Sequence, residues 1–315
     1  TVNAGELDVI ATSNDDAHSL NEFYAIGGAL SVNVTIADAT INSRTEAFTG
    51  TQAGSAPTVG ARTVITLTDA AGRALIDANG SQTAVAAAEG IGASFGITVN
   101  ALLPTADVSG ATRAYVGENT TLVADRLDIT ADGDVMDATA EVTSGSISGF
   151  ASVSALSALA KVTGEVEAFI GAQNDQGSSS SAAPSITISG TDSGDGVVLV
   201  DADSTMDAVT NVFLLSGSLG VTVNVTEPRS ELSGKTRAYV RDGVAMTAGS
   251  LIVEAGEEVD DPLTDDDPDV ADVPRVQYNA TSTTFLLSLA GLVSVSDIKS
   301  NALVNGEVSA YIGAP

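Results

Sequence analysis

The sequence predicts an all-β protein, a parallel β-solenoid (β-helix) of five tandem repeat units with loop insertions. Two blocks of residues, each present five times at regular spacing, indicate the repeat. Inside the units, side-chain character alternates with period two, which is typical of strands with one buried face. A propeller and a string of β-sandwich-like units are the alternatives open to a tandem strand repeat.

The first block ends in Ala followed by an aromatic residue, and a Val that precedes Asn or Ser stands 15 residues before each Ala. The five Val residues are Val32, Val99, Val153, Val223 and Val295, and the five aromatic residues are Phe48, Tyr115, Phe169, Tyr239 and Tyr311. Because this spacing is the same in all five copies, we interpret these ten residues as positions that pack the repeat.

The second block reads apolar-x-Val/Ile-x-Ala, as in residues 127–131. The recurring spacings of 15, 17 and 21 residues give a basic unit of 53 residues. The units are approximately 1–48, 49–115, 116–169, 170–239 and 240–311 of one continuous array over 1–315, and the loop insertions lie near 49–63, 172–188 and 256–274. Since residues 1–7 align with residues 245–251, the end of one copy would continue into the start of another in phase.

Alternation within the units selects strands over helices. Residues 162–170 place small and β-branched side chains on one face and Glu165, Glu167 and Phe169 on the other. Gly, Asn, Asp and Ser recur between such segments, which predicts turns. The small inward residues suit a narrow stacked interior, so the sequence favours the solenoid.

Charges on the outward face predict how the units stack. Two residues before the aromatic position the sign alternates in the series Glu46, Arg113, Glu167 and Arg237. Opposite charges attract on strands about 4.8 Å apart, whereas three short turns per unit would separate them by about 14 Å, beyond the screening length. We therefore expect one wide turn per unit, with Glu167 within about two rungs of Arg237.

The aromatic residues of the first block fall on the same outward face. An exposed aromatic row would be a partner-binding or sugar-binding surface. A repeat preserves its packing before it preserves a site, so the sequence favours a stacked ladder under a covering loop or a neighbouring sheet.

Composition excludes several classes of protein. The chain has 315 residues, a net charge of −29, no Cys and one His. A disulfide scaffold and a Cys-based metal site are thereby excluded, and nucleic acid is not an expected partner because phosphate binding needs a basic face. Only 17% of residues are charged while 43% are hydrophobic, so the chain is expected to fold.

The insertion near 256–274 concentrates acidic residues. Its weak calcium candidates are Asp265, Asp266, Asp267 and Asp269. Hard cations prefer clustered oxygen ligands, but the spacing does not match an EF-hand loop. A solvated acidic loop is the favoured interpretation, no cofactor is expected, and a calcium-dependent binding module is kept as the first alternative function.

No catalytic residues are assigned and the protein is not expected to be an enzyme. His18 is the only His, and no G-x-S-x-G elbow accompanies it. Carboxylate pairs are plentiful, so a polysaccharide-active β-helix is the second alternative, although the absence of Trp argues against a sugar cleft. The longest apolar stretch, 285–295, contains two Ser residues and is shorter than a span of about 20 residues, so membrane insertion is not expected.

The units resemble the tandem repeats of very large bacterial surface adhesins, the filamentous haemagglutinin and leukotoxin-like filamentous adhesin group. The resemblance rests on residues 112–117 (TRAYVG), 127–131 (LDITA) and the Gly-rich segment 96–99, and it covers nearly all of the chain outside the insertions. It implies a secreted or cell-surface protein that is a structural or adhesive part of a fibre. As an adhesive fibre it would contact a host or neighbouring cell surface. End-to-end contact with itself or flanking repeats is expected separately, because the ends of a solenoid are uncapped sheet edges. The resemblance supplies no catalytic residues.

Overall fold

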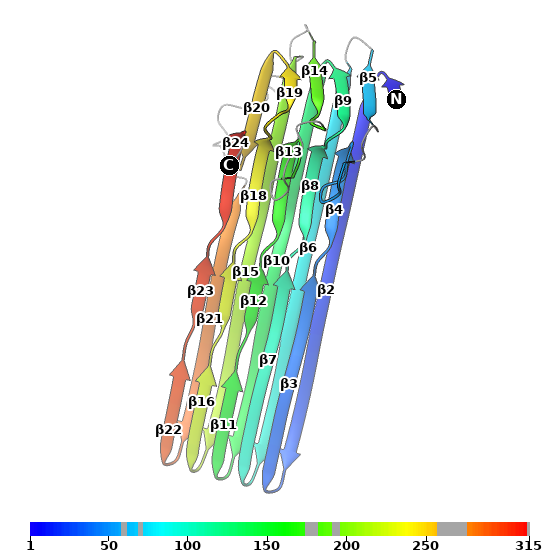
Figure 1. The fold of residues 1–315 in the computed structure, drawn as a ribbon. Coiled ribbons are helices and arrows are strands. Elements are labelled where there is room, and N and C mark those ends of the chain that lie inside the picture. The colour runs from blue at the N-terminus through cyan, green and yellow to red at the C-terminus, as the bar shows by residue number, and fades with distance from the viewer. Residues whose placement is uncertain (58–61, 69–71, 174–181, 191–195, 257–275, 314–315) are drawn as a thin grey trace, which may run out of the picture.

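The structure, a computed structural model, describes residues 1–57, 62–68, 72–173, 182–190, 196–256 and 276–313. Within these ranges the chain forms β-strands and no helix (Figure 1). The strands gather in four sheets, and every pair of neighbouring strands runs parallel. The all-β class and the parallel strands predicted from the sequence are thus confirmed.

The chain visits the four sheets, here called A, B, C and D, in the same order each time. Sheet A contains β1 (Val2–Ala4), β5 (Thr63–Leu67), β9 (Thr120–Ala124), β14 (Ser185–Ile188) and β19 (Ala245–Thr247). Sheet B contains β2 (Leu7–Gly27), β6 (Arg73–Ser94), β10 (Arg126–Ser148), β15 (Val197–Ser218), β20 (Ser250–Ala255) and β21 (Gln277–Ala290). Sheet C contains β3 (Leu30–Ile41), β7 (Ile97–Val108), β11 (Ala151–Leu156), β12 (Leu159–Val162), β16 (Val221–Thr226), β17 (Arg229–Leu232), β22 (Val293–Ile298) and β23 (Asn301–Val304). Sheet D contains β4 (Arg44–Thr49), β8 (Ala111–Val116), β13 (Glu165–Ile170), β18 (Lys235–Val240) and β24 (Glu307–Ile312).

One passage through sheets A, B, C and D is called a rung, and the described residues hold five of them. Sheet B forms one layer, sheets C and D lie end to end across it, and sheet A continues beyond sheet D (Figure 1). Tight turns join sheets B and C at the opposite end of the molecule, here called the turn end. Strand β10 has 23 residues. At about 3.3 Å per residue, a rung therefore extends about 76 Å in the direction of the strands.

The finer part of the sequence prediction needs correction. The strands belong to four separate parallel sheets that stack on one another, rather than to the narrow coil of a solenoid. The interior is flat because long strands of sheet B face the shorter strands of sheets C and D in series. A string of sandwich-like units is wrong, since strands pair with the rungs before and after their own.

The expected single wide turn per unit is confirmed by the register. Glu167 is the direct partner of Arg113 on one side and of Arg237 on the other, so successive units contribute adjacent strands. Equivalent positions of successive rungs therefore line up in columns. Within a column, side chains of the same repeat position follow one another about every 4.8 Å, the spacing between neighbouring strands.

Small apolar side chains fill the interior over much of its length. In β6 the inward residues Ala84, Ala86 and Ala88 are fully buried. One such column runs Ala17, Ala84, Ala138, Ala208 and Ala280. Because an Ala column is thin, sheet B can pack closely against sheets C and D along it.

The interior becomes polar toward the turn end. Asn100 and Asn224 are buried between sheets B and C. Asn100 Nδ2 donates to the carbonyl oxygen of Gly145 at 2.9 Å, and Asn224 Nδ2 donates to Ser216 Oγ at 3.0 Å. These inward Asn residues, together with Asn33, follow the Val of the first sequence block and share one register column.

The outer face of sheet B holds a pair of like charges. Asp137 and Asp207 are register partners on β10 and β15. Burial, and then the charge of Asp207, raise the pKa of Asp137 to about 6. Since the folded protein favours the neutral acid, this carboxyl group lowers stability as the pH rises from about 4 to above 6.

Asp137→Asn is therefore expected to stabilise the protein at pH 8 by about 1 kcal/mol. This value is about half of what a two-unit shift implies, because the side chain is only half-buried. The gain should nearly vanish at about pH 3 and below, where the acid is largely protonated in both states. Urea unfolding at the two pH values measures it, and an equal gain at both would rule out titration of this carboxyl group as the cause.

Candidate stacking interface

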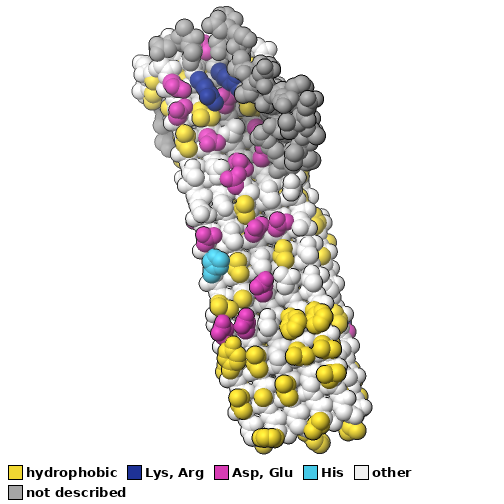
Figure 2. Space-filling view, turned by 180° about the vertical axis from the view of Figure 1, so that it is seen from behind, with side chains coloured by type: hydrophobic (Ala, Val, Ile, Leu, Met, Phe, Trp, Pro, Cys, Tyr) yellow, Lys and Arg dark blue, Asp and Glu magenta, His cyan; other side chains and the backbone are white. Residues whose placement is uncertain are grey.

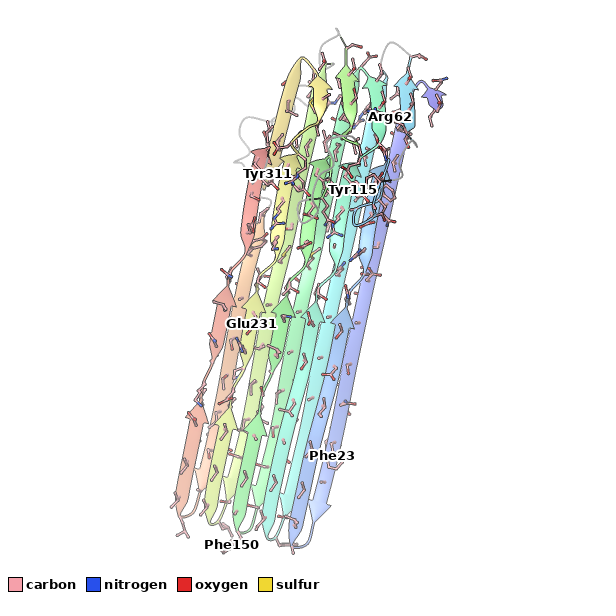
Figure 3. The ribbon with its side chains drawn as sticks, in the orientation of Figure 1. Phe23, Arg62, Tyr115, Phe150, Glu231 and Tyr311 are labelled. Carbon is pink, nitrogen blue, oxygen red and sulfur yellow. The ribbon has the colours of Figure 1, made fainter. Side chains whose placement is uncertain are left out.

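The outer face of sheet D carries an aromatic ladder, defined as Phe48, Tyr115, Phe169, Tyr239 and Tyr311. Neighbouring rings are parallel within 5°, with centroids 4.5–5.2 Å apart. Parallel register explains the stack, because each ring comes from the same position of successive rungs. Figure 3 labels two members, Tyr115 and Tyr311.

Loop residues cover the ladder. The three central rings, those of Tyr115, Phe169 and Tyr239, are buried. The backbone N–H of Ala53 donates to the Tyr115 hydroxyl at 2.8 Å, and burial raises the pKa of Tyr115. A small cavity of about 200 Å³ lies between the loop around Ala53 and the rings of Tyr115 and Phe169. The ladder is therefore a packing element under a loop, and not an exposed sugar-binding surface.

A second ladder, the charge ladder, lies beside the rings. Its centre is Arg113, which contacts Glu46 at 3.3 Å, Glu165 at 2.9 Å and Glu167 at 2.8 Å. The side chains of Arg113 and Glu167 are only 7% and 1% exposed. Burial alone would lower the pKa of Arg113, but Glu167 and the other two carboxylates outweigh it and raise the pKa. The group is a buried, fully charged ion-pair network.

The charge ladder continues through the fourth and fifth rungs. Arg237 lies 3.8 Å from Glu167 and 3.1 Å from Glu307, and Lys235 lies 3.5 Å from Glu165. The hydrogen bond from Arg237 lowers the pKa of Glu307. Each carboxylate thus meets a cation on a neighbouring rung, as the alternating series predicts.

Two glutamines that complete the ladder were missed from the sequence. Gln52 Nε2 donates to Glu46 at 2.8 Å, and Gln173 Nε2 donates to Glu167 at 2.9 Å. Both belong to loops that follow sheet D, and each stands six residues after the carboxylate it binds. That shared spacing is the signal that would have found them.

The Val residues of the first block lie outside the core. They form one column along the outer face of sheet C, in the order Val32, Val99, Val153, Val223 and Val295. At the two ends of the column Val32 and Val295 are exposed. They contact one another across rungs, while the interior is filled by the residues that follow them.

The first and last rungs end the four sheets. Strands β1, β2, β3 and β4 have a neighbour on one side only, as do β19 to β24 on the opposite edge. Side chains of the interior columns are open to solvent there, since Ile312 is 66% exposed whereas its register partner Val240 is 4% exposed. The same holds for both ladders, which stop at Phe48 and Glu46 on one edge and at Tyr311 and Glu307 on the other.

The remaining candidates form no site in the described part of the chain. Asp265, Asp266, Asp267 and Asp269 lie outside the described residues. Among the described residues no group of three or more His, Cys, Asp and Glu side chains could hold a metal ion. His18 is exposed on the outer face of β2.

Comparison with protein-family models, curated proteins and solved structures finds no match to this chain. In the part that the structure describes, no helix is long and apolar enough to cross a membrane.

Proposed function

We propose that the chain is a structural or adhesive segment of an extracellular bacterial surface fibre, in which copies or flanking repeats stack head to tail. The two open edges support this proposal most directly. A sheet edge with a neighbour on one side is a template for a further strand. In a stack of this kind each rung lengthens the array by about 4.8 Å.

The side chains at the two edges are complementary. Following the register from rung to rung places Glu307 in the column of Arg44, and Tyr311 in the column of Phe48. If the last rung of one copy lies against the first rung of the next, Glu307 meets Arg44 and the aromatic ladder continues. Such a contact is heterologous, so it adds copies without limit unless the assembly closes into a ring.

The net charge of −29 opposes association over long distances. At about 0.15 M salt this repulsion is screened beyond about 8 Å, while contacts between adjacent strands at about 4.8 Å persist. Stacking is therefore expected to strengthen when salt is raised from about 0.01 M to 0.15 M.

Cysteine cross-linking tests the proposed register, and the chain has no Cys of its own. Asp38 and Asn301 occupy the same outward column at opposite edges. In the variant Asp38→Cys/Asn301→Cys, stacked copies would bring the two thiols to about 5 Å, within reach of a disulfide. Mild oxidation is expected to give a series of covalent oligomers on a non-reducing gel.

The control is Thr40→Cys/Asn301→Cys, which shifts one thiol by two residues along β3. The separation then rises to about 8 Å, beyond the reach of a disulfide. Equal cross-linking of both variants, or none in the first, would contradict stacking in this register.

A further inference from the structure

The turn end is free of charge on every rung. The uncharged segments that include the five turns are 23–37, 90–106, 142–160, 208–226 and 276–296. The nearest charge to a turn is Asp297, five residues after Leu292 on sheet C, and Glu22 and Glu89 each stand five residues before the end of their strand on sheet B. At about 3.3 Å per residue, the uncharged end is therefore at least about 13 Å deep.

Large apolar side chains project from four of the five turns, and Ile26 lies at the end of β2 beside the first turn. Ile26 is 92% exposed and Phe95 is 90% exposed. Phe150, Leu219 and Leu292 are exposed in the other three turns. Figure 2 shows apolar side chains gathered over this end of the molecule, and Figure 3 places Phe150 far from the ladders at Tyr115 and Tyr311. Soluble proteins rarely leave such a continuous apolar surface in water.

The apolar surface covers both faces as well as the turns. On the outer face of sheet C the column that begins with Leu30 also contains the exposed Val221 and Val293. On the outer face of sheet B, Ile147 and Leu289 are exposed beside an apolar groove. A flat partner protein would cover one of these faces, whereas a fluid apolar medium would cover both faces and the tip.

Inside, the same end is polar. Ser146 Oγ lies 2.6 Å from Ser152 Oγ, and Asn100 and Asn224 bond to neighbouring strands as described above. Polar groups thus face inward, where several of them bond to one another, while apolar groups face outward, the reverse of the arrangement that water favours.

The backbone of the turns is also hydrogen-bonded. Phe95 N donates to the Gly28 carbonyl, Gly149 N to the Ser94 carbonyl, and Gly291 N to the Ser218 carbonyl, each at 3.0 Å. Backbone groups that enter a lipid must have internal partners, and bonds between rungs supply them wherever a turn faces another rung.

From these observations we infer that the turn end inserts into the interfacial layer of an uncharged lipid membrane. Its depth of about 13 Å exceeds the 5–10 Å to which interfacial segments enter a bilayer. The strongly negative remainder of the chain stays in water and disfavours anionic lipid. This inference departs from the expectation that the chain does not insert. It rests on the proposed function, because it takes the surface that the fibre contacts to be lipid. Stacked rungs would align their turns into one continuous apolar edge facing that surface.

The test uses the whole chain with phosphatidylcholine vesicles. Flotation of the wild type is compared with that of Phe95→Ser/Phe150→Ser/Leu219→Ser. We expect the bound fraction to fall about tenfold or more in this triple variant. The matched control, Ile10→Ser/Val85→Ser/Val209→Ser, changes outward apolar residues of sheet B remote from the turns and should float like the wild type.

Fluorescence reports the depth, because the chain has no Trp. Phe150→Trp is expected to shift its emission to the blue with vesicles and to be quenched by brominated lipid, whereas Ile10→Trp should do neither. The inference is overturned if wild-type protein does not float, if both triple variants float equally, or if Phe150→Trp is unaffected. It is also overturned if, without lipid, wild-type protein sediments as an oligomer that Phe95→Ser/Phe150→Ser/Leu219→Ser abolishes, because a second copy would then cover the turn end. Since the cross-linking test does not involve lipid, failure of stacking is distinguishable from failure of membrane binding.

Discussion

Phe169→Ala is expected to lower the free energy of unfolding by about 4 kcal/mol, the usual range for removing a buried aromatic ring. Phe169 is buried at the centre of the aromatic ladder, 4.5 Å from the Tyr115 ring and 5.0 Å from the Tyr239 ring. The substitution leaves a cavity with stacked rings on both sides and a loop above it, so neighbouring groups have little freedom to fill the space. Urea unfolding measures the loss.

Phe285→Ala is the matched control. Phe285 also stacks on a Phe, Phe213, with centroids 5.2 Å apart, but it is 55% exposed. Its loss should cost about 1 kcal/mol or less, because little buried surface is removed. Comparable losses for Phe169→Ala and Phe285→Ala would show that burial of the ladder does not stabilise the fold.

Arg113→Met is the second large expected effect, a loss of about 4 kcal/mol at pH 7. The side chain of Met replaces much of the apolar stem but leaves Glu46, Glu165 and Glu167 without the cation that contacts all three. Glu167 is almost completely buried and keeps only the longer contact with Arg237 at 3.8 Å, so its poorly compensated charge accounts for much of the penalty.

The pH dependence of the Arg113→Met variant identifies the cause. Without the cation, three neighbouring carboxylates repel one another in a partly buried site, which destabilises the folded state for as long as they are charged. The variant should therefore recover stability below about pH 4, where the carboxyl groups are protonated in both states. Lys161→Met removes a cation 3.7 Å from Asp107 in a more exposed pair and should cost less than about 1 kcal/mol. A deficit for Arg113→Met that is independent of pH would point to lost packing instead.

The positions of the strands and the order of the rungs were predictable from the sequence repeat. Period two in residues 162–170 locates β13, and the sign change between Glu167 and Arg237 requires adjacent strands. A chain that repeats its side chains at one spacing has few ways to bring opposite charges within screening distance. Parallel register then also places the aromatic residues over one another.

The inward and outward faces of sheet C were harder to assign. Hydrophobicity alone would place Val32 inside and Asn33 outside, and the structure has the reverse. In β3 the buried Ile41 stands nine residues after Val32, and an odd spacing within one strand puts the two on opposite faces. The repeated spacing of nine residues therefore contained the answer, but the preference of Val for a core obscured it.

The loop contacts of the charge ladder could not be derived from the strand pattern. Gln52 and Gln173 reach their carboxylates through the path of two loops, and alternation does not describe that path. The division into four sheets was equally hard to predict. It depends on where the strands of sheet B end, and only the register shows that β2 and β6 end together, with Gly27 beside Ser94.

Electron cryo-microscopy of the purified chain at 0.15 M salt tests the central claim most directly, namely that open rungs stack head to tail in register. The expected result is a ribbon about 76 Å wide, with strands across it and a spacing of about 4.8 Å along it. Five rungs per chain give an expected axial rise of about 24 Å per copy. Separate particles at every protein concentration, or filaments in which the strands run along the axis, would contradict it.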